Sequence, residues 1–270
     1  MRIDHGSGRA KACVSQRRRP IAKRMIMEAT LPPALSAQLA IERRLDTLAH
    51  NLANLRTVGF RSEEVKFDEL IKPGNGFGAD PVSMASEGTS FLSTKNGELT
   101  QTGNPLDMAV AGDAYFGFQG PNGVVYTRDG RMRVNQAGTV ETLTGYPLVD
   151  AGGAQIQIDP NGGALTIARD GMITQGGRQL GAVGLFTIPQ TAKLTRFDTS
   201  GVIPDQGAQP ALDFSQVGVM QGFVEGSNVN PVLEMTRLIE LQRAFESAAN
   251  LVQSNERSMS DAIQTLGSNK

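Results

Sequence analysis

Histidine and cysteine, which often serve as general base and nucleophile in enzymes, are scarce in this chain of 270 residues. It contains two histidines, His5 and His50, and one cysteine, Cys13. A Ser/His/Asp triad would have to use one of the histidines as its base. His50 falls in a helical pattern beside a stripe of leucines, which favours a surface or packing role. We therefore expect a protein that is not an enzyme.

Two loops have compositions that invite a ligand. DPNGGALTIARD, residues 159–170, has the length of a calcium loop, but Gly163 takes the place of a third ligand and Ala164 that of the turn glycine. A β-turn fits this stretch better. GNGFG, residues 74–78, lacks the spacing of a dinucleotide site. We expect no cofactor and no metal, and a single cysteine excludes a disulfide framework.

Basic residues are concentrated at the N-terminus. Residues 1–26 hold eight Lys or Arg and one acid, Asp4, so this segment carries +7 and the remainder −8 of a total of −1. A folded part with that balance does not favour nucleic acid. No apolar run is long enough to insert in a membrane, and no signal-peptide core follows the basic run. We interpret residues 1–26 as a disordered basic tail or, preferably, as a mis-assigned start, with Met27 the true first residue.

A helix is expected over residues 27–60. Its apolar side chains recur at spacings of four and three residues, the pattern of a heptad seam. The seam consists of Ile41, Leu45, Leu48, Leu52 and Leu55. Pro33 suits a first helical turn, and together with Pro32 it should prevent an earlier start. Gly59 is placed to end the helix in a left-handed conformation.

The middle of the chain contains two segments of different composition. Residues 61–95 are rich in Gly, Pro and Ser with weak periodicity, which predicts an extended linker. Residues 96–224 alternate short apolar runs with glycine, which predicts an antiparallel β domain. Asp129-Gly130 separates VVYTR from RMRVN and predicts a hairpin, because such a turn requires positive φ. TIARDGMIT, residues 166–174, repeats the signal.

A second heptad seam runs through residues 225–270. Asn230 can cap this helix, and Pro231 occupies its first turn. The seam consists of Leu238, Leu241, Phe245, Ala248, Val252, Asn255, Met259, Ala262 and Leu266. As a polar member of the seam, Asn255 either sets the register between helices or faces water.

The fold class is therefore α+β, with a terminal coiled-coil-like helix pair, formed by the N- and C-terminal helices, flanking the antiparallel β domain. Val232, Met235 and Ile239 give the second helix a further apolar face. Because a helix pair buries only one stripe per helix, this surplus face indicates partner helices from other subunits. The alternative is that both helices pack on the β domain as an ordinary α+β core.

Three separate motifs resemble the flagellar rod and hook family. HNLANLRTVGFR, residues 50–61, resembles its N-terminal motif. Residues 103–148 resemble its central signature through GNPLD and YTRDG, and EGSNVNPVLEMTRLIELQRAFE, residues 225–246, resembles its C-terminal signature. The likeness spans about residues 27–267.

The resemblance implies a structural subunit of the basal-body rod that packs its terminal helices with neighbours and transmits torque. The short β domain and the sequence GSNVNPVLEM resemble those of the proximal rod protein of this family, which favours a place in the proximal rod. The alternatives are a distal rod or hook subunit and, more remotely, a periplasmic ligand-binding or hydrolase domain. The resemblance also implies export by the flagellar type III apparatus and assembly in the periplasm. The implied partners are other rod subunits and further copies of itself, the membrane-ring end and the distal rod.

The residues expected at the assembly interface come from the two seams and the terminal motifs. They are Leu45, Leu48, Asn51, Leu52, Asn54, Leu55, Gly59, Phe60, Asn228, Asn230, Leu238, Leu241, Gln242, Phe245, Val252, Asn255 and Met259.

Overall fold

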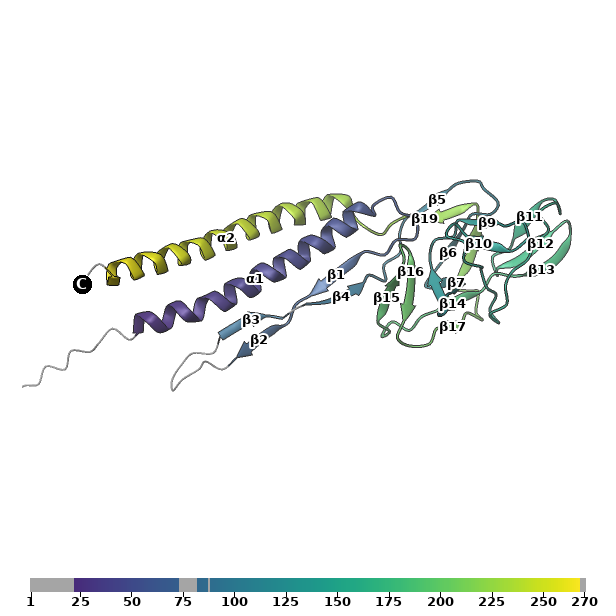
Figure 1. Ribbon diagram of the computed structural model, residues 1–270. Coiled ribbons are helices and arrows are strands. Elements are labelled where there is room, and N and C mark those ends of the chain that lie inside the picture. The colour runs from purple at the N-terminus through teal and green to yellow at the C-terminus, as the bar shows by residue number, and fades with distance from the viewer. Residues whose placement is uncertain (1–21, 73–81, 87, 268–270) are drawn as a thin grey trace, which may run out of the picture.

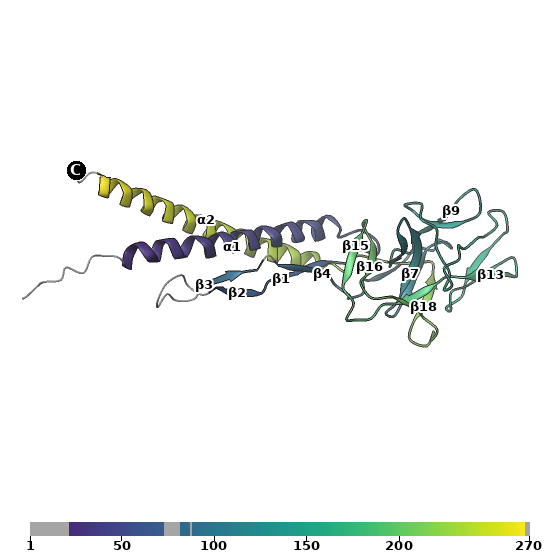
Figure 2. The same ribbon diagram turned by 60° about the horizontal axis from the view of Figure 1, so that its bottom comes forward.

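Two long helices form a stalk that projects from one end of a β domain (Figure 1). The computed structural model describes the backbone of residues 22–72, 82–86 and 88–267. Within these ranges it leaves out the side chains of residues 22–34, 69–72 and 82–85 and those of Asn255, Met259, Ala262 and Leu266. Helix α1 spans Ala22–Ala53 and helix α2 spans Pro231–Gly267. The two run antiparallel and contact each other, side by side in Figure 1 and crossing at an angle in Figure 2.

Helix α1 differs from the predicted helix at both ends. It begins at Ala22, so Pro32 and Pro33 lie inside it, and the predicted start at Pro33 was wrong. A proline inside a helix removes one hydrogen bond and bends the axis, and the turns on either side can continue the helix. The helix ends at Ala53, well before Gly59, which does not cap it.

The start of α2 was predicted correctly. The backbone N–H groups of Val232 and Leu233 donate to Asn230 Oδ1 at 3.1 and 3.2 Å. These N–H groups have no acceptor within the helix, so the cap supplies an acceptor to two donors that would otherwise lack one. Glu234 lies in the first turn, where a negative charge interacts favourably with the helix dipole.

The described seam side chains of α2 are half-buried, and its second apolar face is open. Leu238, Leu241, Phe245 and Val252 are partly covered beside α1. Val232 is 73% exposed, and Met235 and Ile239 are each 52% exposed. On α1, Leu48 is buried, and Leu45 and Leu52 are half-buried; Leu55 lies in the turn after α1 and is also half-buried. The alternative of a common core between both helices and the β domain is therefore wrong, because most of the stalk extends away from that domain (Figure 2).

The segment predicted as an irregular extended linker is residues 61–95, and its described strands form a two-stranded ribbon beside α1 (Figure 1). Its antiparallel pairs are β1 (Glu63–Lys66) with β4 (Thr89–Leu92) and β2 (Glu69–Lys72) with β3 (Val82–Ala85). The guanidinium of Arg44 on α1 lies 4.7 Å from the centre of the Phe67 ring, which fastens the ribbon to the helix. Strands of four residues are too short to give a clear alternating pattern, so the sequence did not reveal them.

The largest sheet of the β domain has six antiparallel strands in the order β15-β16-β8-β7-β14-β17. Their bounds are β7 Tyr115–Gly120, β8 Gly123–Thr127, β14 Leu185–Thr187, β15 Leu194–Phe197, β16 Gly201–Pro204 and β17 Gln209–Pro210.

Smaller antiparallel sheets complete this domain, which confirms the prediction of an antiparallel β domain. The three-stranded sheet contains β11 Leu165–Ile167, β12 Met172–Gln175 and β13 Arg178–Ala182. The two-stranded pairs are β9 Met132–Val134 with β10 Val140–Thr142, β6 Met108–Ala111 with β18 Gly218–Gln221, and β5 Leu99–Gln101 with β19 Phe223–Glu225.

One of the two predicted hairpins is present. Strands β11 and β12 pair around Gly171, which has a φ of +85°. The hairpin expected at Asp129-Gly130 is wrong, because β8 pairs with β7 and β16, and β9 pairs with β10. Gly130 does not have positive φ, and its carbonyl accepts a hydrogen bond from Met108 N at 2.9 Å. The chain at this point lies beside the start of β6, where Asp107 and Arg131 form an isolated antiparallel bridge.

The main apolar core lies inside the β domain. It includes Phe116 and Leu148, which are fully buried, with Met108 and Ile173 packed in the same cluster. A core of this kind gives the β domain its own stability. The described part of the stalk contributes far less buried apolar surface.

Candidate assembly site

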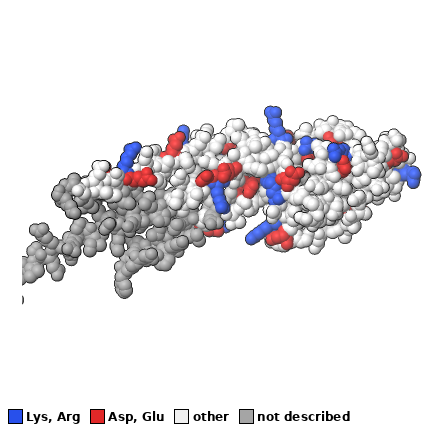
Figure 3. Space-filling model, viewed as in Figure 1, with Lys and Arg blue, Asp and Glu red and all other residues white. Residues whose placement is uncertain are grey.

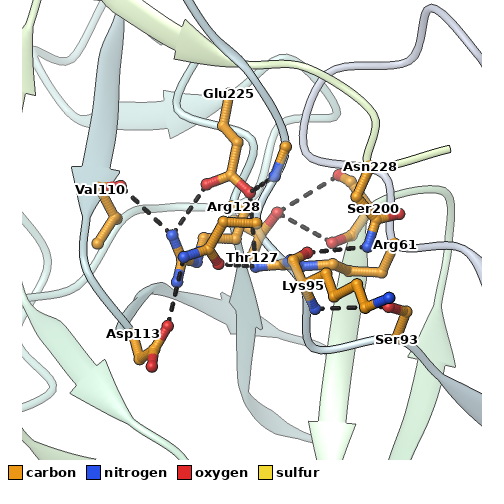
Figure 4. A network of polar contacts seen from close by, with 12 residues as sticks. Arg61, Ser93, Lys95, Val110, Asp113, Thr127, Arg128, Ser200, Glu225 and Asn228 are labelled. Atoms are coloured by element: carbon orange, nitrogen blue, oxygen red, sulfur yellow. Dashed lines mark hydrogen bonds and ion pairs between the residues drawn. The ribbon is translucent and has the colours of Figure 1, made fainter. Parts of the chain in front are cut away.

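The three sequence motifs meet where the stalk joins the β domain. Arg61 follows the turn after α1, Arg128 follows β8, and Glu225 ends β19. Their side chains converge (Figure 4) and are only 2%, 1% and 2% exposed, respectively. We call these three residues the charge cluster.

The carboxylate of Glu225 connects both arginines of the charge cluster. Its Oε2 lies 2.9 Å from Arg128 Nη1, and its Oε1 lies 3.5 Å from Arg61 Nη2. Oε1 also accepts a hydrogen bond from the backbone N–H of Gly97 at 2.9 Å. Two cations therefore share one anion, and the cluster carries one excess positive charge.

Carbonyl oxygens and an aromatic ring compensate for that excess. Arg128 donates to the carbonyls of Val110 and Gly112 at 3.3 and 2.6 Å. Arg61 donates to the carbonyl of Lys95 and to Asn96 Oδ1. The ring of Tyr115 lies 5.0 Å from the Arg128 guanidinium and 5.6 Å from that of Arg61.

Burial lowers the pKa of Arg128, and the nearby Glu225 carboxylate opposes this shift by raising it. The guanidinium nevertheless remains charged, as arginine does in proteins. Each ion of the charge cluster has partners from another segment, so the cluster holds together three segments that are distant in the sequence. We call the region where these three segments meet the joint.

Two asparagines fasten the backbone around the joint. The Asn51 amide donates to the carbonyl of Glu63 and accepts from its N–H, both at 2.9 Å. The Asn228 amide accepts from Ser62 N at 2.7 Å and donates to the carbonyl of Lys95 at 2.9 Å. At Glu63 the Asn51 amide takes the place of a second neighbouring strand, because β1 pairs with β4 on its other edge only.

We expect Asn51→Ala to destabilise the protein by about 1–3 kcal/mol, because it leaves a backbone donor and acceptor in a buried place without partners. Urea unfolding followed by circular dichroism measures this change. Asn54→Ala is the matched control, since its Nδ2 donates to the carbonyl of His50 in an exposed, local bond of 2.9 Å. Equal losses for both variants would contradict the assigned role of Asn51.

Phe60 and Gly59 lie at the same joint. Phe60 is 1% exposed, and the Arg196 guanidinium lies 4.4 Å from its ring centre. The ring of His50 lies 5.5 Å from it, which is a packing contact. A Cβ added to Gly59 would lie 2.3 Å from the backbone nitrogen of Asp129. The motif residues of the predicted interface thus make contacts within the chain, and contacts between subunits stay a prediction for them.

Sequence reasoning did not select Glu225 or Arg128, although both lie in the motifs. The signal that could have found them is a charged residue inside an apolar strand, as in GFVEG and VVYTR. Gln242 is exposed on α2, and the side chains of Asn255 and Met259 lie outside the described part of the structure.

A cleft of about 440 Å³ lies beside the joint, between α1, α2 and β1. Leu48 and Leu241, one from each seam, line it together with Asn51. Glutamates and arginines complete its walls. Acidic and basic side chains are interspersed along the stalk face in Figure 3.

Neither a membrane span nor a metal cluster is found in the part of the chain that the structure describes. No helix there is both long and apolar enough to cross a bilayer. Nor does any group of three His, Cys, Asp or Glu residues within those ranges come together as metal binding requires.

Two family profiles match two of the three segments that meet at the joint, those that carry Glu225 and Arg128. The C-terminal profile of flagellar basal body rod FlgEFG proteins matches residues 220–265, and the D1 domain profile of flagellar hook proteins FlgE/F/G matches residues 109–175. The flagellar basal-body rod protein FlgF of Mesorhizobium japonicum is 48% identical over 242 residues, covering 90% of this chain and 99% of that protein. The chain belongs to the family of flagellar basal-body rod proteins.

The chain is similar to different members of the family to different degrees. FlgF of Rhizobium meliloti is 44% identical over 247 residues, covering 90% of this chain and all of that protein. The rod protein FlgG of Bacillus subtilis is 27% identical over 260 residues, covering 87% of this chain and 97% of that protein. The chain is therefore more similar to these FlgF proteins than to this FlgG. It is a structural subunit of the flagellar basal-body rod, which is built from several kinds of subunit.

Proposed function

We propose that this chain occupies the proximal rod and that α1 and α2 form a coiled-coil-like pair, which packs against the helices of neighbouring subunits. The terminal helices then form the inner tube, and the β domain forms an outer layer that braces adjacent subunits. Torque passes through these packed elements as a drive shaft requires, with no chemical step. The proximal position is supported by the likeness to FlgF, the proximal rod protein. A distal rod or hook subunit is the alternative.

The observation that carries the proposal is the open apolar face of α2. Val232 is 73% exposed, and Met235 and Ile239 are each 52% exposed, although they lie close to the buried charge cluster in the chain. Burying apolar surface contributes about 25 cal/mol per Å². A long helix pair is marginal alone, so helices of neighbouring subunits supply the missing stabilisation.

We further infer that the flagellar type III apparatus exports the chain and that it assembles in the periplasm. Helices that depend on neighbours for stability suit delivery as an unfolded chain. A chain with one cysteine also avoids mispaired disulfides in an oxidising compartment. The inferred partners are further copies, other rod subunits, the membrane-ring end and the distal rod.

Limited proteolysis with mass spectrometry tests the assembly role of the helices. In the isolated protein we expect trypsin to cleave first at exposed arginines of the stalk, such as Arg43 and Arg257, leaving a fragment close to residues 96–224. In purified basal bodies the same sites should be protected. Stalk helices that resist cleavage equally in the isolated protein would show that they need no neighbours, and the proposal would be wrong.

A further inference from the structure

Glu234 has a carboxylate oxygen without a partner in the wall of the cleft. The residue is 5% exposed, and its Oε1 accepts a hydrogen bond from Arg237 Nη1 at 2.9 Å. Its Oε2 is buried and accepts no hydrogen bond from any described residue. A buried carboxylate oxygen without a donor is costly, so a donor from outside the subunit would be stabilising.

The charge of the cleft favours a cation as that donor. Four glutamates line it against two arginines, one of which is already paired with Glu234. These residues are Glu63, Glu64, Glu234, Glu240, Arg44 and Arg237. Rotation about the last torsion of Glu234 is easy, because terminal torsions of this type are broad and two-fold. Either oxygen can therefore turn toward an entering side chain.

The same helix carries a basic side chain that has no partner. Arg243 is exposed, and it makes no ion pair or side-chain hydrogen bond with the described residues. It continues the open apolar face, because it follows Ile239 by four residues. Glu234 and Arg243 are separated by about two and a half turns, so they lie on opposite faces of α2.

We propose that Arg243 of a second copy of this chain enters the cleft and pairs its guanidinium with Glu234. The inference rests on the proposed function, since it names one contact of the assembly described above. Donor and acceptor lie on opposite faces, so two copies cannot satisfy each other reciprocally. The contact is heterologous, and it leaves a free Glu234 at one end and a free Arg243 at the other for further copies.

Charge exchange tests this pairing in cells that lack their own copy of the gene and express the full-length variant. We expect Glu234→Arg and Arg243→Glu each to lower the number of assembled rods about tenfold. The double variant should assemble several-fold more rods than either single variant, because the pair between copies is restored with its polarity reversed, while the pair of Glu234 with Arg237 inside the subunit stays broken. Rods are counted by electron microscopy of purified basal bodies, and export and thermal unfolding are measured for each variant.

The matched control combines Glu234→Arg with Arg257→Glu, since Arg257 is also exposed and lies two heptads further along the same face. We expect no recovery there. Milder variants guard against misfolding: Glu234→Gln and Arg243→Gln together should be no worse than either alone. A double charge exchange as poor as the single changes, or equal recovery with Arg257, overturns the pairing and leaves the proposed function intact. If the wild-type gene itself restores no rods, the proposed function fails and the pairing with it.

Discussion

Glu225→Gln lowers the free energy of unfolding by about 3–5 kcal/mol, the cost of breaking a buried ion pair by removing one partner. Arg61 and Arg128 would then be two guanidinium groups, 2% and 1% exposed, without an anion near them. Glutamine keeps the volume of the side chain and can still accept from Gly97. The loss therefore reports the charge, and urea unfolding followed by circular dichroism measures it.

Asp68→Asn is the control for Glu225→Gln. Asp68 pairs with Lys66 at 4.0 Å, and both side chains are mostly exposed, at 68% and 75%. A surface pair of this kind contributes less than about 1 kcal/mol. If both variants changed stability equally, the charge cluster would not hold the joint. Because Glu225 lies only a few residues before α2, we also expect its loss to free α2 from the β domain and to increase proteolysis near residue 228.

Gly59→Ala is expected to cost about 2–5 kcal/mol, from backbone strain and overpacking together. Gly59 has a φ of +70°, a conformation that an alanine adopts with strain. The added Cβ would also lie 2.3 Å from the nitrogen and 2.7 Å from the Cα of Asp129, which are backbone atoms that cannot turn aside. Relief requires the N-terminal motif and the turn after β8 to separate. The melting temperature of the purified variant measures the effect.

Gly103→Ala separates the two causes. Gly103 has a similar φ of +73°, but a Cβ there would meet nothing within 4 Å. We therefore expect Gly103→Ala to lower the free energy of unfolding only by the cost of backbone strain, about 1–2 kcal/mol. The difference between the two variants gives the cost of the close approach. If Gly103→Ala were as destabilising as Gly59→Ala, the contact with Asp129 would contribute nothing.

Local patterns in the sequence predicted the types of element well. Helix α2, its cap at Asn230 and the hairpin around Gly171 each depend on residues within a few positions of one another. The same holds for the antiparallel character of residues 96–224, since repeated glycines and short alternating runs are local signals. These features were recovered because local backbone preferences and side-chain spacing decide them.

The pairing of strands and the extent of α1 were not predicted. Strand β8 finds its partners in β7 and β16, and β16 lies far along the chain, so the Asp-Gly signal at residue 129 was overridden by tertiary packing. The ribbon of residues 61–95 depends on α1 as a support. Helix α1 continues through Pro32 and Pro33, against the local preference of proline.

The joint combines features that local sequence predicts with features that depend on tertiary packing. Three motifs in the sequence were enough to identify the family and the helical and β segments that carry them. The structure was needed to show that Arg61, Arg128 and Glu225 share one buried place and that Gly59 lies against the backbone of Asp129. The physical reason is that the burial of a charge, or the close approach of two backbones, is a property of segments far apart in sequence. Neither leaves a periodic trace in any one of them.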